Sequence, residues 1–326
     1  MSRKGGYLPL CTLLSALCVS AEAQQPKVVP RVAFLAATSA TDSGAALLLS
    51  AEFRKLGYIE GQNIVFEYCY ADNQHERLLS LADELVHLKV DVLIASSTTA
   101  ALAAKRATRT IPIVFFASGD PVSAGLVNSL ARPGENLTGF SRIAAVLAGK
   151  RLELLKQTIG QLFRVAVLWH PGNPGSEEIW KESQAPAGAL GLKLQSLEVS
   201  NASQFESAFQ EATKTRSTAL AVTLSALIRS QRKRIAALAI KNRLPAIYER
   251  RDFIESGGLM SYGAEQSEAY RRVTVFVDKI LKGIKPADIP VEQPTEFELV
   301  INLKAAKQIG LMVPPSVLAR ADKVIK

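Results

Sequence analysis

Apolar runs of strand length alternate with helix-length segments along almost the whole chain from Arg31 onward. The runs are continuously hydrophobic, whereas a strand with one solvated face would alternate apolar and polar residues. Continuous runs are typical of parallel sheets that helices cover on both faces. The first series predicts strands at 31–37, 63–71, 90–97, 111–116 and 136–140, with helices at 43–58, 73–88, 98–108 and 122–132.

A second series of the same plan follows the first. Its predicted strands are 164–170, 192–200, 218–223, 244–248 and 259–263, and its helices include 148–159 and 226–242. The tail adds an amphipathic helix, a proline-rich connector, a strand at 297–302 and two short helices. We therefore expect an α/β fold of two doubly wound parallel-sheet lobes, in which ligands lie beyond the carboxyl ends of the strands.

The first 23 residues are typical of a secretory signal peptide. Arg3 and Lys4 supply a basic start, an apolar stretch follows, and Ala21 to Ala23 form a small-x-small cleavage site. We expect export to the periplasm with cleavage near Ala23. The alternatives are an uncleaved anchor and a lipoprotein modified at Cys18, although the residue before Cys18 is not small.

Cysteine usage and charge bear on several functional classes. Cleavage would leave Cys69 alone, which excludes an internal disulfide and favours a buried apolar residue over a catalytic thiol. The net charge of +9 raises the question of a nucleic-acid partner. The densest basic run, 229–234, opens a predicted helix and has no aromatic residues interleaved. We interpret it as a solvated helix face and expect no nucleic-acid partner.

The loops after the predicted strands are rich in hydroxyl groups and in residues that begin helices. They contain no GxSxG elbow, Walker loop, GxGxxG or HExxH motif. We therefore expect no catalytic residue, metal or cofactor, and a protein that is not an enzyme. His170, the one histidine in such a loop, is interpreted as a hydrogen-bonding residue.

Asp120 and Pro121 follow directly on the strand 111–116. Aspartate is a favoured N-cap and proline suits the first helical position, so the pair predicts the start of the helix 122–132. The Asp120 carboxylate either only caps or also faces a ligand, and a catalytic role is disfavoured. Similarly, Tyr248 and Tyr262 either stack on a flat ligand or are half-buried residues at strand ends.

Several stretches resemble bacterial ABC transporter substrate-binding proteins of the tryptophan-binding type, from about Arg31 to Lys326. They include "LADELVHLKVDVLIA" (81–95), "GDPVSAGLVNSLARPGENLTGFS" (119–141), "KNRLPAIYERRDFIESGGLMSYG" (241–263) and "FVDKILKG" (276–283). The resemblance implies a type I periplasmic binding protein fold, in which three crossovers join the lobes and a hinge closes them on the ligand. The lobes would be 31–139 plus 264–284 and 140–263 plus 285–326.

The same resemblance implies a function and a site. A monomer would trap an amino acid or related small carboxylate, aromatic in some members, and deliver it to an ABC permease in the inner membrane. A loop containing Asp-Pro, common in the family, is replaced here by "TLSALI" (223–228), so a second-lobe acidic contact is missing. An exported two-lobed α/β enzyme and a ligand sensor for a membrane receptor are the alternatives. The implied ligand-binding residues are Ser39, Ser97, Thr98, Asp120, Pro121, Asn173, Thr223, Tyr248 and Tyr262.

Overall fold

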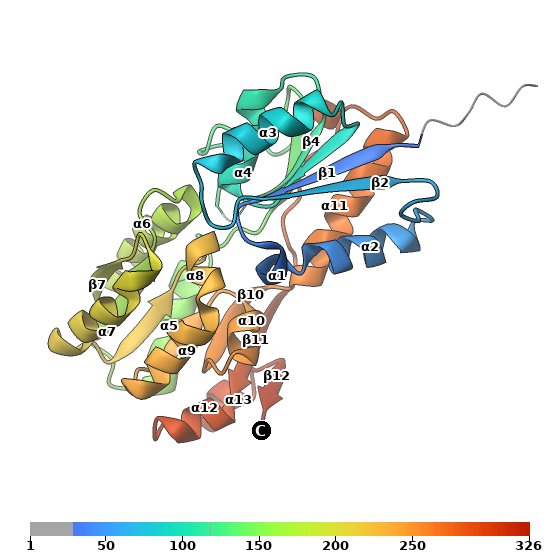
Figure 1. The fold of residues 1–326 in the computed structure, drawn as a ribbon. Coiled ribbons are helices and arrows are strands. Elements are labelled where there is room, and N and C mark those ends of the chain that lie inside the picture. The colour runs from blue at the N-terminus through green and yellow to red at the C-terminus, as the bar shows by residue number, and fades with distance from the viewer. Residues whose placement is uncertain (1–28, 118) are drawn as a thin grey trace, which may run out of the picture.

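A computed structural model describes residues 29–117 and 119–326, and the predicted signal peptide lies outside these residues. Two separate sheets form two lobes (Figure 1), which confirms the predicted α/β fold of two doubly wound lobes. Among the described residues, no helix is long and apolar enough to cross a membrane.

The first sheet is entirely parallel, with strand order β2-β1-β3-β4-β5. Helices α3 and α4 cover one face, and α2 and α11 cover the other (Figure 1). The strands are β1 (Arg31–Ala36), β2 (Val65–Tyr70), β3 (Val92–Ala95), β4 (Ile113–Ala117) and β5 (Leu137–Ser141). The helices are α2 (Ala45–Lys55), α3 (Arg77–His87), α4 (Thr98–Ala107) and α11 (Gln266–Leu281), with a short α1 (Ala40–Ser43) before α2.

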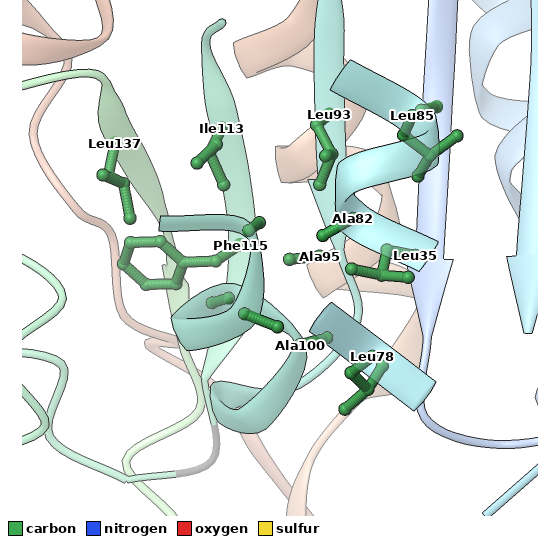
Figure 2. Packing of buried hydrophobic residues seen from close by; sticks show 14 of the residues in the cluster. Leu35, Leu78, Ala82, Leu85, Leu93, Ala95, Ala100, Ile113, Phe115 and Leu137 are labelled. Carbon is green, nitrogen blue, oxygen red and sulfur yellow. The ribbon is translucent and has the colours of Figure 1, made fainter. Parts of the chain in front are cut away.

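Helices pack on both faces of this sheet, which explains why the sequences of its strands are continuously apolar. Figure 2 shows Leu78 and Leu85 of α3 lying over the sheet beside Leu35 and Leu93. On the other face, alternate residues such as Phe34 of β1 pack against α2 and α11. Every residue of a central strand is therefore buried, and polar groups are confined to the strand ends.

The second sheet has strand order β12-β11-β10-β9-β8-β6-β7. β11 pairs antiparallel with β10 and parallel with β12, so β11 and β12 run opposite to the other strands of this sheet. Helices α7 to α10 cover one face, and α5, α6, α12 and α13 lie on the other. The strands are β6 (Arg164–Trp169), β7 (Lys193–Glu198), β8 (Ala219–Val222), β9 (Ala246–Tyr248), β10 (Met260–Ala264), β11 (Phe297–Asn302) and β12 (Lys323–Ile325). The helices are α5 (Ala148–Ile159), α6 (Pro174–Ala189), α7 (Phe205–Lys214), α8 (Ala226–Ser230), α9 (Arg232–Lys241), α10 (Arg251–Glu255), α12 (Leu303–Gln308) and α13 (Pro315–Leu318).

The chain passes between the lobes three times: after β5, between β10 and α11, and before β11. The lobe limits 31–139 plus 264–284 and 140–263 plus 285–326 remain proposals. Ile289 and Val291 pack into the cores of the first lobe, and the Glu292 N–H donates to the Gly139 carbonyl. These contacts favour a third crossover after Glu292 rather than at 285.

The helix predicted for 122–132 is wrong, because this segment forms one turn and then an irregular loop. Gly125 has φ +69°, in the left-handed region, and its N–H donates to the Val122 carbonyl. The Leu126 N–H then returns to the Pro121 carbonyl, so the turn closes on itself and no helix continues. The predicted helix 226–242 is likewise divided at Gln231 into α8 and α9.

We predict that Gly139→Ala destabilises the first lobe by about 2 kcal/mol, because overpacking a dense core costs this much. A Cβ at Gly139 would lie 2.3 Å from the Phe115 carbonyl oxygen on the neighbouring strand, which cannot move without breaking the sheet. Urea unfolding measures the loss. As a control, Gly188→Ala at an exposed position of α6 meets nothing within 4 Å and should raise stability by about 0.5–1 kcal/mol. Equal unfolding midpoints for the two variants would contradict the packing described.

Candidate functional site

A cavity lies between the lobes, at the carboxyl ends of strands from both sheets. Residues of the first lobe, the second lobe and the segments joining them all contribute to its wall. Such edges are where open α/β sheets bind ligands. The lining residues are Phe34, Ala37, Thr38, Ser96, Ser97, Thr98, Thr99, Phe116, Arg142, Asn173, Leu224, Ser225, Ala226, Arg229, Arg250, Ala269 and Tyr270.

The first lobe presents the N-terminus of α4 to this cavity. Ser97 is the N-cap, and its Oγ accepts a hydrogen bond from the Ala100 N–H at 3.2 Å. Thr98 follows and is only 4% exposed, yet its hydroxyl has no hydrogen-bond partner among the described residues. The helix end therefore offers orphan N–H groups, its positive dipole end and an unused buried hydroxyl.

The second lobe presents the N-terminus of α6 at Asn173. The Asn173 Oδ1 caps the helix by accepting from the Ser176 N–H at 3.0 Å. Behind it, the Thr223 hydroxyl donates to the Leu168 carbonyl at 3.1 Å and lies 2.6 Å from the Ser176 Oγ. Thr223 thus anchors α6 to the sheet from below, while Asn173 faces the cavity.

Three arginines line the cavity: Arg229 and Arg250 from the second lobe, and Arg142 from the first crossover. Asp252 accepts from the Arg229 Nε at 3.2 Å and from Arg250 at 3.0 Å. Burial opposes ionisation of Asp252, but the charges of Arg250 and Arg229 outweigh it and lower the pKa of this carboxyl. One carboxylate therefore serves two of the three guanidinium groups.

Arg142 has a different environment. Burial and the charge of Arg250 lower its pKa to about 10, so it remains protonated at neutral pH. None of the described carboxylates forms an ion pair with it, and its backbone N–H bonds to the Ala117 carbonyl at the end of β4. Arg142 also borders a second cavity beside the hinge segments, together with Leu224 and Arg250.

The second cavity contains the buried Glu249 and Arg151. Burial raises the pKa of Glu249, and the nearby charges of Arg151 and Arg142 partly offset this effect. Arg151 donates to the carbonyls of Tyr262 and Ala144, both at 2.9 Å, so it holds the crossover segments together. Because Arg151 ties together the segments that cross between the lobes, we regard this cavity as part of the hinge, although Glu249 Oε1 has no hydrogen-bond partner among the described residues.

A direct contact joins the lobes where Asp120 meets α6. The Asp120 N–H donates to both oxygens of the Glu178 carboxylate, at 2.9 and 3.0 Å. The Asp120 carboxylate accepts from the Val122 N–H at 2.9 Å and the Ser123 hydroxyl at 2.6 Å. Asp120 therefore caps its own turn with its side chain and bridges the lobes with its backbone.

A second contact between the lobes pairs His75 with His170, with ring centroids 5.7 Å apart. Burial lowers the pKa of both, the charge of His75 further lowers that of His170, and Glu76 and Glu177 act in the opposite sense. Neither His75 ring nitrogen has a hydrogen-bond partner among the described residues. Both imidazoles are therefore neutral at pH 7. A group of three or more metal-ligating side chains is not found in the described part of the chain.

Of the predicted ligand-binding residues, the structure places Ser97, Thr98 and Asn173 at the cavity. Ser39 is at the start of α1, where its hydroxyl lies 3.1 Å from that of Thr41. Asp120 and Pro121 form the bridging turn described above, and Thr223 lies beneath α6. None of these four lines the interlobe cavity among the residues described.

The two tyrosines are also not at the cavity. Tyr248 is completely buried in the core of the second lobe and stacks on Phe253 at 4.7 Å. Tyr262 packs beside Phe297 on the α5 face of the sheet, while its neighbours Ser261 and Gly263 face the hinge cavity. Side chains alternate along a strand, so these tyrosines point away from the cavities.

Sequence reasoning missed the three arginines and Tyr270. Arg142 directly follows β5 and lies two residues after the predicted strand 136–140, which is the signal that could have identified it. Arg229 belongs to the run that we interpreted as a solvated helix face, and for this residue that interpretation is wrong. It lies at the end of the short α8 and turns toward Asp252.

We predict that Gly119→Ala weakens solute binding by 10-fold or more, which corresponds to about 1.4 kcal/mol. A Cβ at Gly119 would lie 1.6 Å from Glu178 Oε2, so the lobes could approach only if this carboxylate turned away and lost its hydrogen bonds from the Asp120 N–H. Isothermal titration with the solute that occupies the cavity measures the effect. Adding Glu178→Ala to the same variant removes the obstructing carboxylate and should restore part of the affinity. Wild-type affinity in Gly119→Ala alone would show that this contact does not limit closure.

We predict that the histidine pair lowers stability as the pH falls. The pKa of each imidazole is lowered in the folded protein, so below the ordinary value of 6.5 the unfolded chain binds more protons. The contribution of the histidine pair to the free energy of unfolding is therefore complete above pH 6.5 and is lost as the pH falls. The pKa of Glu178 is raised in the folded protein, so this group alone would increase stability as the pH falls. To separate the two effects, the melting temperature of wild type is compared with that of the double variant His75→Gln/His170→Gln at each pH. A difference that does not change between pH 7.5 and 5.5 would refute the prediction.

Comparison with known proteins identifies the family. Residues 49–325 match the model of the family described as ABC transporter substrate binding protein. The chain is 29% identical over 255 residues to a tyrosine-binding protein of Clostridioides difficile, covering 78% of this chain and 73% of the relative. It resembles a conserved domain protein of Vibrio cholerae (TM-score 0.86, 28% identity) and an ABC domain of Streptococcus pneumoniae in complex with L-Trp (TM-score 0.83, 24% identity); each comparison covers 91% of this chain and 99% of the other. The chain therefore belongs to the ABC transporter substrate-binding protein family.

Proposed function

We propose that this protein traps an amino acid or related small carboxylate between its lobes and delivers it to an ABC permease in the inner membrane. The observation that carries the proposal is the interlobe cavity, which Arg142, Arg229 and Arg250 line together with the N-terminus of α4. Guanidinium groups and helix N-termini both bind carboxylates. Support for an aromatic ligand comes from the tyrosine-binding relative and from the rings of Phe34, Phe116 and Tyr270 in the cavity wall.

Trapping, rather than catalysis, fits the chemistry of the site. The hydroxyls of Ser97 and Ser225 are engaged as N-caps, accepting from backbone N–H groups at 3.2 Å. A histidine or carboxylate that could activate a hydroxyl as a nucleophile is not found in the described lining of the cavity. We therefore propose that the protein is not an enzyme and that closure and release of the lobes constitute its action.

Export completes the proposal. The signal peptide predicted for residues 1–23 would direct the chain to the periplasm, with cleavage near Ala23. There the protein would act as a monomer, whose two lobes open and close about the crossover segments near Arg142 and Glu265. The permease would then receive the ligand from the closed form.

We predict that at least one solute in a panel of amino acids, aromatic acids and short organic anions raises the melting temperature. At 100 times Kd the shift should be about 5 °C, because binding to the folded state alone adds about 2.7 kcal/mol. The Arg142→Gln variant should lose this shift. Arg109→Gln, on an exposed arginine of the first lobe, is the matched control and should retain it. A panel without any stabilising solute would contradict the proposal.

A further inference from the structure

We infer that the ligand of the interlobe cavity is an organic acid with an apolar body and without an ammonium group, whose carboxylate lies between Arg142 and the N-terminus of α4. The inference rests on the proposed function and narrows its ligand class. Three features of the cavity support it: its charge, its unused hydrogen-bond donors and its apolar wall.

The charged side chains in the described lining of the cavity are all positive. Arg142, Arg229 and Arg250 all line it, whereas the carboxylate closest to them, Asp252, is held by ion pairs to Arg229 and Arg250. The remaining guanidinium, on Arg142, has no ion pair to a carboxylate among the described side chains. A ligand carboxylate would supply that partner, and a planar guanidinium can bind it through two parallel hydrogen bonds.

The α4 terminus supplies further donors to the same cavity. This helix has 10 residues, so its N–H groups and dipole are well developed at Thr98 and Thr99. Independently, the Thr98 hydroxyl is buried, lines the cavity and has no partner among the described residues. A buried hydroxyl without a partner is costly, and a bound carboxylate oxygen would satisfy it.

The rest of the wall is apolar. Phe34 and Phe116 are almost fully buried, and Phe116 lies 5.1 Å from the ring of Tyr270. Leu224 and three alanines complete this surface. An aromatic or aliphatic body fits here, adjacent to the anionic end held by Arg142.

An ammonium group would be bound unfavourably in the same cavity. The polar side chains described in the lining are hydroxyls, one amide and three guanidinium groups, and the latter repel a cation. Glu249, the other acidic group near Arg142, is buried on the hinge side together with Arg151. The carboxylate of a zwitterionic amino acid would therefore contribute favourably to the binding free energy, and its ammonium group would contribute unfavourably.

Isothermal titration with matched pairs tests the inference. The pairs are L-phenylalanine with 3-phenylpropionate, L-tyrosine with 3-(4-hydroxyphenyl)propionate, and L-norleucine with hexanoate, and phenethylamine serves as the cation without a carboxylate. We expect the acid of at least one pair to bind 10-fold or more tightly than its amino acid, and no binding of phenethylamine. Amino acids that bind as tightly as their acids, or more tightly, would overturn the inference and leave the proposed function intact. If neither acids nor amino acids bind, both fail.

Variants locate the carboxylate. Arg142→Gln should weaken binding of the best acid by about 30-fold or more, and Arg142→Lys should recover part of this loss, which shows that the fold is retained. Thr98→Val keeps the side-chain shape and removes the hydroxyl, with an expected loss of about 5-fold. Arg109→Gln should bind as wild type. Unchanged affinity in both Arg142→Gln and Thr98→Val would overturn the placement.

Discussion

Burial of the parallel strands on both faces determines where this protein can have a binding site. Because helices cover each face, the central strands β3 and β4 contain only buried residues, and polar side chains are placed where the strands end. In a parallel sheet these ends share one edge. The two lobes turn these edges toward each other, so hydroxyls, helix N-termini and arginines from distant parts of the chain meet in one cavity.

Two of the described contacts between the lobes are individually weak. The Glu178 carboxylate accepts from one backbone N–H, and two neutral imidazoles lie side by side. Neither contact buries a large apolar surface, so neither resists separation strongly. The two lobes approach each other closely at Gly119, because a methyl group at this position would contact the Glu178 carboxylate. Under the proposed function, a ligand that contacts both walls of the cavity would therefore determine how far the lobes close.

The sequence predicts the lobes well because strand burial leaves a continuous apolar signal. It fails at 122–132, where Gly125 in the left-handed region ends a helix that the side-chain pattern alone favours. At the site it identifies helix caps, since Ser97 and Asn173 are recognisable from residue type and position. It cannot assign Tyr262, because alternation along β10 fixes only that Ser261 and Tyr262 face opposite ways. Arg229 requires the three-dimensional structure, since only the fold shows that it lines the same cavity as Arg142.

Electrostatics connects the arginines to closure. Arg229 and Arg250 belong to the second lobe and Arg142 to the first crossover, whereas the positive end of α4 belongs to the first lobe. Bringing these walls together opposes like charges, and Asp252 offsets only part of that repulsion because it already pairs with two arginines. An anion between the walls reverses the sign of the interaction, since it attracts both. The charge of the ligand, more than its fit to the apolar wall, would then favour the closed form, and an uncharged molecule of the same shape would bind to one lobe without holding the other.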